Sequence, residues 1–209
     1  MVQKSEDEAK PPPRPRGRPR SFDTEATLAQ ATLAFWQRGY AATSLDDLSH
    51  ATGLNRPSLY GAFGDKHALY LLALRLYTEQ SNAAIAAALA DRSLRDGLLR
   101  VYELALQLYY PPDEAARGCL LIGTAATEAP RDEAIRQQLG DSLRGFNTAF
   151  EARLQRAVND GELPRGTDVA MRAQLASAVL HSMALRARAG DAREELAAFA
   201  AASLDFVCR

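Results

Sequence analysis

One stretch decides the fold of the amino-terminal region: Thr43-Ser44-Leu45-Asp46-Asp47-Leu48-Ser49-His50-Ala51-Thr52-Gly53-Leu54-Asn55-Arg56-Pro57-Ser58-Leu59-Tyr60. The Thr43/Ser44 pair can cap a helix of about two turns. Gly53 can adopt the positive φ of a tight turn, and the polar Asn55 precedes a second short helix. Leucines on both segments are spaced so that the two helices pack together. The pattern predicts a helix-turn-helix.

The second helix of such a motif enters the major groove of DNA, where its first residues meet base edges. Arg56 lies at that place, and a guanidinium can form two hydrogen bonds with O6 and N7 of guanine. Ser44 and Lys66, each at the start of a helix, are expected to hold phosphates, the first through the N–H groups of the helix amino terminus and the second through its charge. An ordinary solvated hairpin of helices is less favoured, because the caps, the turn and the polar face agree with one another. The residues predicted to contact DNA are Thr43, Ser44, Arg56, Pro57, Ser58, Tyr60, Gly61 and Lys66.

After Ser21 the chain is rich in Ala, Leu, Arg and Glu and shows no strand-like alternation, so an all-α fold is predicted. Glycines, prolines and capping residues such as Thr167 divide it into about nine helices. The expected organisation is a basic arm (1–20), a helix-turn-helix domain (21–67) and a helical-bundle domain (68–209). The expected helices cover residues 24–38, 44–52, 56–63, 66–90, 93–110, 118–128, 131–159, 168–189 and 191–208.

The arm is rich in proline, which fixes φ and removes backbone donors, and it is therefore expected to be extended or disordered. Between Lys10 and Arg20 it carries five basic residues and no acidic ones. Its segment Arg16-Gly17-Arg18-Pro19 is similar to the core of an AT-hook, in which Arg16 and Arg18 would enter an A·T-rich minor groove. A basic tail that is attracted to phosphates without entering the groove is an equally open interpretation.

Charge is distributed unevenly along the chain. The 209 residues include 25 basic and 26 acidic side chains, so the formal net charge of −1 excludes a uniformly basic nucleic-acid coat. The range from Lys10 to Lys66 nevertheless holds eight basic and five acidic residues, a net charge of +3, which leaves −4 for the remainder. A hydrophobic content of 47% is enough for one large or two small folded units. Nucleic-acid binding is therefore expected only at the amino-terminal end.

Other classes of protein are disfavoured by missing features. Two cysteines, far apart in sequence, cannot form a disulfide framework or a four-ligand zinc site. His50, His67 and His181 lack metal-ligand spacing, and no catalytic or cofactor-binding motif is present. We therefore expect neither an enzyme nor a cofactor. The start has no signal peptide, and apolar runs are too short to span a membrane, so a cytoplasmic protein without membrane contact is expected.

The range 22–77 resembles the amino-terminal pattern of the TetR/AcrR transcriptional regulators. The resemblance implies nine helices, an obligate homodimer, a carboxy-terminal domain that binds a small-molecule effector, and repression of a double-stranded DNA operator that this effector relieves. Ala62 departs from the pattern, because family members commonly have His there, so a phosphate contact of that side chain is absent. The matching residues are Phe35, Gly39-Tyr40, Thr43-Ser44, Gly53-Leu54, Leu59-Tyr60, Phe63 and Asp65-Lys66.

Bulky residues in the carboxy-terminal domain are candidates for the ligand pocket, although for any single one of them a place in a plain core is the favoured interpretation. Helices 168–189 and 191–208 are rich in alanine and could form a four-helix dimer interface about a two-fold axis. The predicted pocket residues are Tyr102, Leu106, Tyr109, Cys119, Ile122, Phe146, Phe150 and His181. The predicted interface residues are Leu175, Val179, Leu196 and Phe199.

Two alternatives to a ligand-responsive repressor remain. Cys119 is expected near a helix amino terminus, where the pKa of a thiol can be depressed, so a redox-responsive regulator is conceivable. A small buried hydrophobic residue is the favoured interpretation of Cys119. A constitutive, architectural DNA-binding protein would use the arm and the helix-turn-helix, but it would leave the carboxy-terminal domain without a role.

Overall fold

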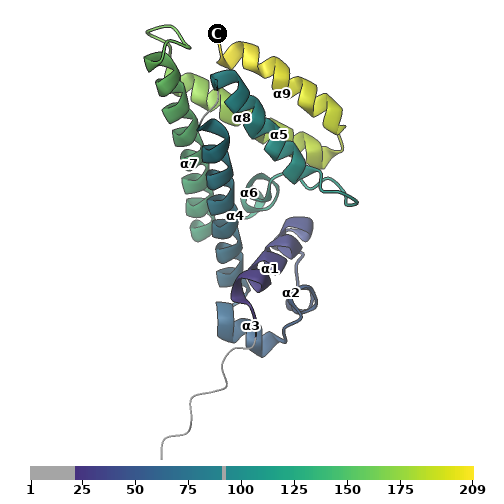
Figure 1. Cartoon of the computed structure of the whole chain (residues 1–209). Helices are drawn as coiled ribbons and strands as arrows, with labels where there is room; N and C mark the ends of the chain where they lie inside the picture. The colour runs from purple at the N-terminus through teal and green to yellow at the C-terminus, as the bar shows by residue number, and fades with distance from the viewer. Residues whose placement is uncertain (1–21, 91–92) are drawn as a thin grey trace, which may run out of the picture.

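The computed structural model describes residues 22–90 and 93–209, and every regular element in these ranges is a helix. Arg16 and Arg18 of the arm lie outside the described residues. Figure 1 shows α1, α2 and α3 at one end, with α4 running from them alongside α7, and α5, α8 and α9 at the other end. The helices are α1 (Thr24–Arg38), α2 (Leu45–Thr52), α3 (Arg56–Phe63), α4 (Lys66–Leu89), α5 (Leu94–Tyr109), η1 (Leu121–Ala125), α6 (Ala126–Glu128), α7 (Glu133–Asn159), α8 (Val169–Ala189) and α9 (Arg193–Val207). The predicted all-helical fold is confirmed.

The caps of the helix-turn-helix follow directly from local sequence. Ser44 accepts a hydrogen bond from the backbone N–H of Asp47 at 3.1 Å, and the Asp47 carboxylate accepts one from the N–H of Ser44 at 2.8 Å. This reciprocal capping box satisfies two N–H groups that the first turn leaves without helical partners. Gly53 ends α2 in the left-handed region with φ 67°, and Asn55 caps α3 by accepting from the N–H of Ser58 at 2.9 Å. The predicted boundaries of these helices are therefore confirmed.

Two predicted elements differ from the structure in detail. The expected helix 118–128 is a π-helical turn, η1, which continues into the short α6. Helix α8 is capped by Asp168 rather than Thr167, because the Asp168 carboxylate accepts from the N–H of Met171 at 3.0 Å. The Thr167 hydroxyl instead donates to the carbonyl of Pro164 at 2.8 Å and stabilises the preceding turn.

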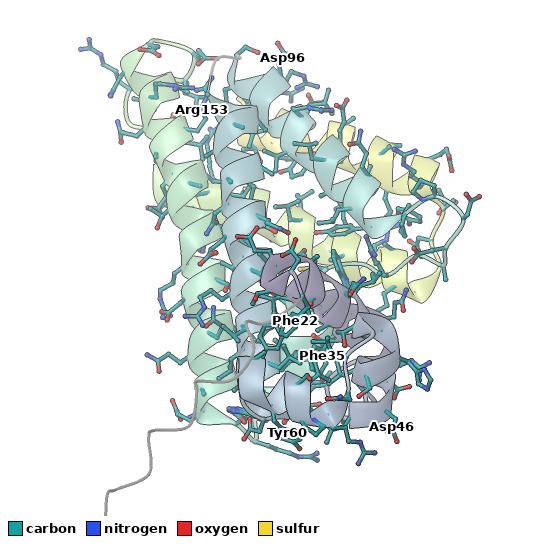
Figure 2. All side chains as sticks on the ribbon, turned by 60° about the horizontal axis from the view of Figure 1, so that its bottom comes forward. Phe22, Phe35, Asp46, Tyr60, Asp96 and Arg153 are labelled. Carbon is teal, nitrogen blue, oxygen red and sulfur yellow. The ribbon has the colours of Figure 1, made fainter. Side chains whose placement is uncertain are left out.

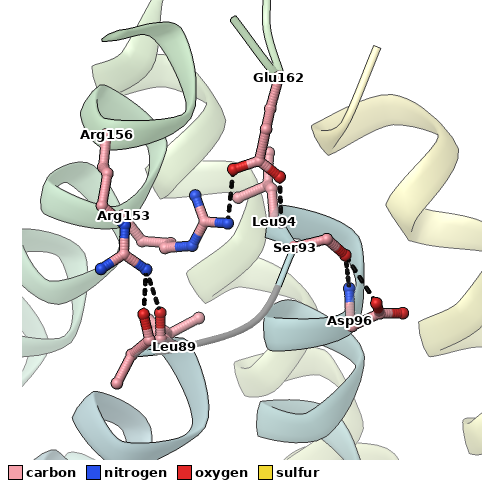
Figure 3. Close-up of polar contacts among 8 residues, drawn as sticks. Leu89, Ser93, Leu94, Asp96, Arg153, Arg156 and Glu162 are labelled. Carbon is pink, nitrogen blue, oxygen red and sulfur yellow. Dashed lines mark hydrogen bonds and ion pairs between the residues drawn. The ribbon is translucent and has the colours of Figure 1, made fainter. Parts of the chain in front are cut away.

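A polar cluster secures the end of the molecule farthest from α3 (Figure 3). The Arg153 side chain is 3% exposed and pairs with Glu162 at 2.7 Å, and Glu162 also accepts from the N–H of Leu94 at 2.6 Å. Arg156 donates to the carbonyls of Leu89 and Ala90 at the carboxyl end of α4, where a cation is favoured. These contacts join α4, α5 and α7 and so support the frame on which the domain is built. None of the described helices combines the length and apolar character needed to cross a bilayer.

Candidate DNA-binding surface and ligand cavity

Helix α3 presents its amino-terminal half to solvent. Arg56, Pro57 and Gly61 are exposed, and Tyr60 is 46% exposed, whereas Leu59 packs into the core under the helix. Ser58 is half-buried, and its N–H is used by the Asn55 cap. Figure 2 shows Asp46 and Tyr60 at the same end of the molecule, opposite the end that carries Asp96 and Arg153. The predicted recognition helix thus offers the side chains that sequence reasoning assigned to its outer face.

Two acidic side chains in the first turn of α2 are each paired with an arginine of a neighbouring helix. Asp46 Oδ1 accepts from Arg56 Nε at 3.1 Å and Nη2 at 2.7 Å, and Asp47 accepts from Arg38 at 2.7 Å. Hydrogen bonds from Ser44 are the main cause that lowers the pKa of Asp47. Residues 22–66 contain three basic and five acidic side chains, a net charge of −2 with histidine neutral. The two Asp–Arg pairs neutralise negative charge close to the surface that would meet phosphates, and so they reduce repulsion between that surface and DNA.

Thr43 does not offer its side chain to DNA. It is fully buried, and its hydroxyl donates to the carbonyl of Gly39 at 2.6 Å, so the prediction of a DNA contact by this side chain is corrected. The Ser44 hydroxyl is exposed, but it donates to the Asp47 carboxylate at 2.6 Å and accepts from the Asp47 N–H. In the absence of DNA, the Ser44 hydroxyl therefore already forms both hydrogen bonds of the capping box.

Lys66, in the first turn of α4, lies with Nζ 4.5 Å from the centroid of the Tyr40 ring. Burial lowers the pKa of Lys66. The cation–π contact with Tyr40 holds the ammonium group beside the first turn of α4. The neighbouring His67 lies 2.8 Å from the carboxylate of Asp132, which caps α7. The start of α4 is thus held between the helix-turn-helix and α7.

A cavity of about 490 Å³ lies between α1, α4, α5, α7 and α8. Its volume falls within the range of about 300–1,000 Å³ that is typical of small-molecule sites, and its wall is mainly apolar. Of the predicted pocket residues, Tyr109, Cys119, Phe146 and His181 line this cavity. The others do not line it: Tyr102, Leu106 and Phe150 are buried in the core, and Ile122 is half-buried outside the lining.

Trp36, on α1, forms part of the cavity wall, and sequence reasoning did not assign it there. Its indole Nε1 donates to the carbonyl of Gly118 at 3.0 Å, and its ring meets Tyr77 edge-on at 4.9 Å. The guanidinium of Arg117 lies 4.2 Å above the same ring. A helix of the amino-terminal helical unit therefore contributes directly to the cavity. The position of Trp36 on an apolar helical stripe indicates burial but not the partner, because that partner is more than eighty residues away in the chain.

Cys119 is buried in the same wall and accepts a hydrogen bond from the hydroxyl of Tyr77 at 3.1 Å. Burial raises the pKa of the Cys119 thiol, which is the reverse of the depressed pKa on which the redox hypothesis depends. His181 also faces the cavity, and burial lowers the pKa of its imidazole. In the part of the chain that the structure describes, its Nε2 is buried without a hydrogen-bond partner. His181 is therefore a neutral polar group available to a ligand.

The predicted dimer residues differ in exposure. Leu196 is fully buried and Val179 is 9% exposed, so both pack within this chain, and Phe199 is half-buried against Arg186. Leu175 is 44% exposed, and it lies on one face of α8 with other exposed apolar residues. We call this exposed set the α8–α9 apolar face: Met171, Leu175 and Leu185 on α8 and Phe206 on α9.

Within residues 22–90 and 93–209, no three His, Cys, Asp or Glu side chains come together in a way that could hold a metal ion.

Comparisons with known proteins agree with this geometry. Residues 28–73 match the family described as bacterial regulatory proteins, tetR family, and residues 96–203 match the tetracyclin repressor-like, C-terminal domain. The chain is 31% identical over 194 residues to the HTH-type transcriptional repressor ComR of Escherichia coli, covering 90% of each protein. It is 33% identical over 148 residues to the transcriptional regulator YezE of Bacillus subtilis, covering 70% of this chain and 76% of that one.

Among solved structures, a cysteine mutant of the TetR family regulator CifR, in complex with a 26-base-pair operator DNA, superposes with a TM-score of 0.83. The two sequences are 33% identical, and the match covers 90% of this chain and 98% of that one. The resemblance noted in the sequence is thereby confirmed. The chain belongs to the TetR family of bacterial transcriptional regulators.

Proposed function

We propose that this protein is a homodimeric repressor that binds a palindromic operator through α3 and releases it when a small apolar effector occupies the 490 Å³ cavity. The observation that carries the proposal is the position of Trp36, which belongs to α1 and also lines the cavity. A ligand in the cavity can therefore displace α1, the helix against which α2 packs. A ligand shifts the protein toward the released state only by its difference in affinity for the two states.

Dimerisation is required by the geometry of operator recognition. Two recognition helices must meet half-sites about 34–36 Å apart, or a multiple of that distance. The α8–α9 apolar face supports this step, because large apolar side chains that are exposed on these two helices gain stability when a second copy covers them. The same symmetry applies to the DNA, so an isologous dimer predicts a palindromic operator.

The relatives support the same reading. ComR and BdcR of Escherichia coli are described as repressors, and the solved structure of the CifR mutant is a complex with double-stranded operator DNA. The cavity also favours a ligand-responsive regulator over a constitutive architectural protein, because an architectural protein has no need of a ligand-binding site. Regulation of bacterial DNA would place this protein in the cytoplasm.

Footprinting on the DNA beside its own gene tests the proposal. We expect a protected palindrome, and protection that is lost when an apolar effector fills the cavity. Ala105 lines the cavity, and the variant Ala105→Phe should keep the footprint but lose the response to the effector because the space is taken. Absence of any protected palindrome, or equal release of wild type and variant, would refute the proposal.

A further inference from the structure

The described part of the cavity wall has one charged side chain, which restricts the chemical class of its occupant. Among the described residues that line it, Arg117 alone carries a permanent charge, and neither Asp nor Glu is present. No ion pair joins the Arg117 guanidinium to a carboxylate within the described ranges. Glu114 and Arg188 line a neighbouring hollow that Arg117 also borders, but on the side of the cavity no described residue presents a carboxylate to Arg117. A cation that borders an apolar space without a paired carboxylate favours an anionic occupant.

Arg117 is held in place rather than free to turn away. Its backbone N–H donates to the carbonyl of Tyr109 at 2.9 Å, and its Nε donates to the carbonyl of Leu108 at 3.2 Å. The guanidinium plane lies over Trp36, 4.2 Å from the ring centroid. A planar guanidinium fixed in this way keeps its terminal N–H groups for an additional acceptor, and a carboxylate matches their geometry.

The rest of the wall fits an apolar body attached to that anion. Most of the wall is apolar, and the neutral polar side chains of Gln80, Gln107 and His181 can donate or accept hydrogen bonds. The apolar surface comes from residues that include Ile85, Val101, Leu104, Phe146 and Leu180. The volume of about 490 Å³ is large enough for a small drug-sized molecule but not for a peptide domain.

We propose that the effector is an apolar monocarboxylate, whose anionic group binds Arg117 where this residue stacks on Trp36. The inference rests on the proposed function, since it names the chemical class of the effector for the same cavity. A carboxylate can bind the N–H edge of the guanidinium while its face stays on the Trp36 ring, and Trp36 belongs to α1. The polar end of the ligand therefore binds at the point where the cavity meets the DNA-binding unit.

Direct binding measurements on the full chain test this proposal without DNA. The probes are decanoate and 1-naphthoate, each compared with its uncharged methyl ester by calorimetry and by tryptophan fluorescence. Trp36 is the single tryptophan of the chain, so its emission reports on the site itself. We expect each carboxylate that fits to bind about tenfold tighter than its ester, because hydrogen bonds to charged groups contribute that much.

Three variants separate the charge of Arg117 from its structural contacts. Arg117→Gln should abolish the preference for acid over ester, Arg117→Lys should keep part of it, and Arg144→Gln, on the exposed face of α7, should leave it unchanged. If Arg117→Gln fails to fold, the affinities of acid and ester for the wild type and for Arg117→Lys are sufficient to test the proposal. The proposal is overturned by equal affinity of acid and ester in the wild type, by a preference that survives Arg117→Gln, or by no carboxylate binding at all.

Separate titrations of the protein on operator DNA, with the same acids and esters, distinguish this inference from the proposed function. Release of the operator by the ester as effectively as by the acid would refute the carboxylate class and leave ligand-induced release intact. Binding of the acid through Arg117 without loss of operator binding would support the class and refute release.

Discussion

Arg56 of the recognition helix and Asp46 of α2 are joined by two hydrogen bonds, from Nε at 3.1 Å and from Nη2 at 2.7 Å to the same carboxylate oxygen. Both side chains are largely exposed, so the pair itself adds little to stability. The pair instead fixes the orientation of the Arg56 guanidinium. The carboxylate occupies the side edge of the guanidinium, formed by Nε and Nη2. We therefore expect Arg56 to approach a base with its Nη1 end.

Removal of Asp46 tests this orientation. Asp46→Ala should raise affinity for non-specific DNA, because a negative charge near the phosphates is lost, and should reduce discrimination against an operator with an altered G·C pair. Arg56→Ala should cost about 1–3 kcal/mol on the cognate operator. Fluorescence anisotropy at fixed salt measures both quantities. Asp141→Asn, on the exposed surface of α7, is the matched control, and an unchanged specificity ratio for Asp46→Ala would refute the orienting role.

The arm supplies positive charge that the folded helix-turn-helix lacks. Residues 22–66 carry a net charge of −2, whereas Lys10 to Arg20 contains five basic residues and no acidic ones. Replacement of Arg16 and Arg18 by Ala should weaken operator binding and reduce its salt dependence. A loss confined to operators with A·T-rich flanks would support entry into the minor groove, and an equal loss on G·C-rich flanks would leave only phosphate contacts.

The α8–α9 apolar face is expected to hold the dimer together. The double variant Leu175→Asp and Phe206→Asp places charges on side chains that are 44% and 77% exposed, so it should spare the fold of the single chain. Light scattering after size exclusion should show a monomer, and operator affinity should fall because one recognition helix cannot span both half-sites. Gln137→Glu, on exposed α7 surface, should stay dimeric. A dimeric double variant would contradict this assignment.

Cys119 should react slowly with thiol reagents. Burial raises its pKa, so the thiolate that attacks an oxidant or alkylating agent is scarce at pH 8. In a Cys208→Ser background, iodoacetamide should modify native protein far more slowly than unfolded protein, as followed by mass spectrometry. Oxidants should leave operator binding intact. Rapid modification accompanied by release of DNA would revive the redox hypothesis.

Glu162 links stability to pH. Burial alone would raise its pKa, but hydrogen bonds from the Leu94 N–H and from Arg153 outweigh burial and hold the pKa below the ordinary value of 4.5. The folded state thus favours the carboxylate, and its stabilisation is present above pH 4.5 and is lost as the pH falls through the folded-state pKa.

Replacement of this carboxylate gives the corresponding mutational prediction. Glu162→Gln should lower the free energy of unfolding at pH 7 by about 2–3 kcal/mol, because the buried Arg153 loses its carboxylate partner. The acid limb of the stability curve should become flatter in urea unfolding experiments. Glu103→Gln, which removes an exposed pair with Arg100, should change stability by no more than about 0.5 kcal/mol.

The sequence by itself determined the helices and their order, because caps and turns act over a few residues. Ser44 and Asn55 each cap a helix by accepting from an N–H three positions further on, and Gly53 adopts the predicted positive φ. The family pattern is carried by the same local residues. The outer face of α3 followed as well, since helical periodicity separates buried Leu59 from exposed Arg56 and Tyr60.

Only the tertiary structure decided which apolar residues enclose space and which fill it. Tyr102 and Tyr109 lie on the same helix and are equally plausible in sequence, yet only Tyr109 lines the cavity. Trp36 reaches Gly118 across the chain, and Gly118 is required there because a Cβ would lie 2.3 Å from the carbonyl oxygen of Ala184. Periodicity reports that a side chain is buried, but its partner depends on how distant helices pack, and that packing joins the DNA-binding unit to the ligand cavity.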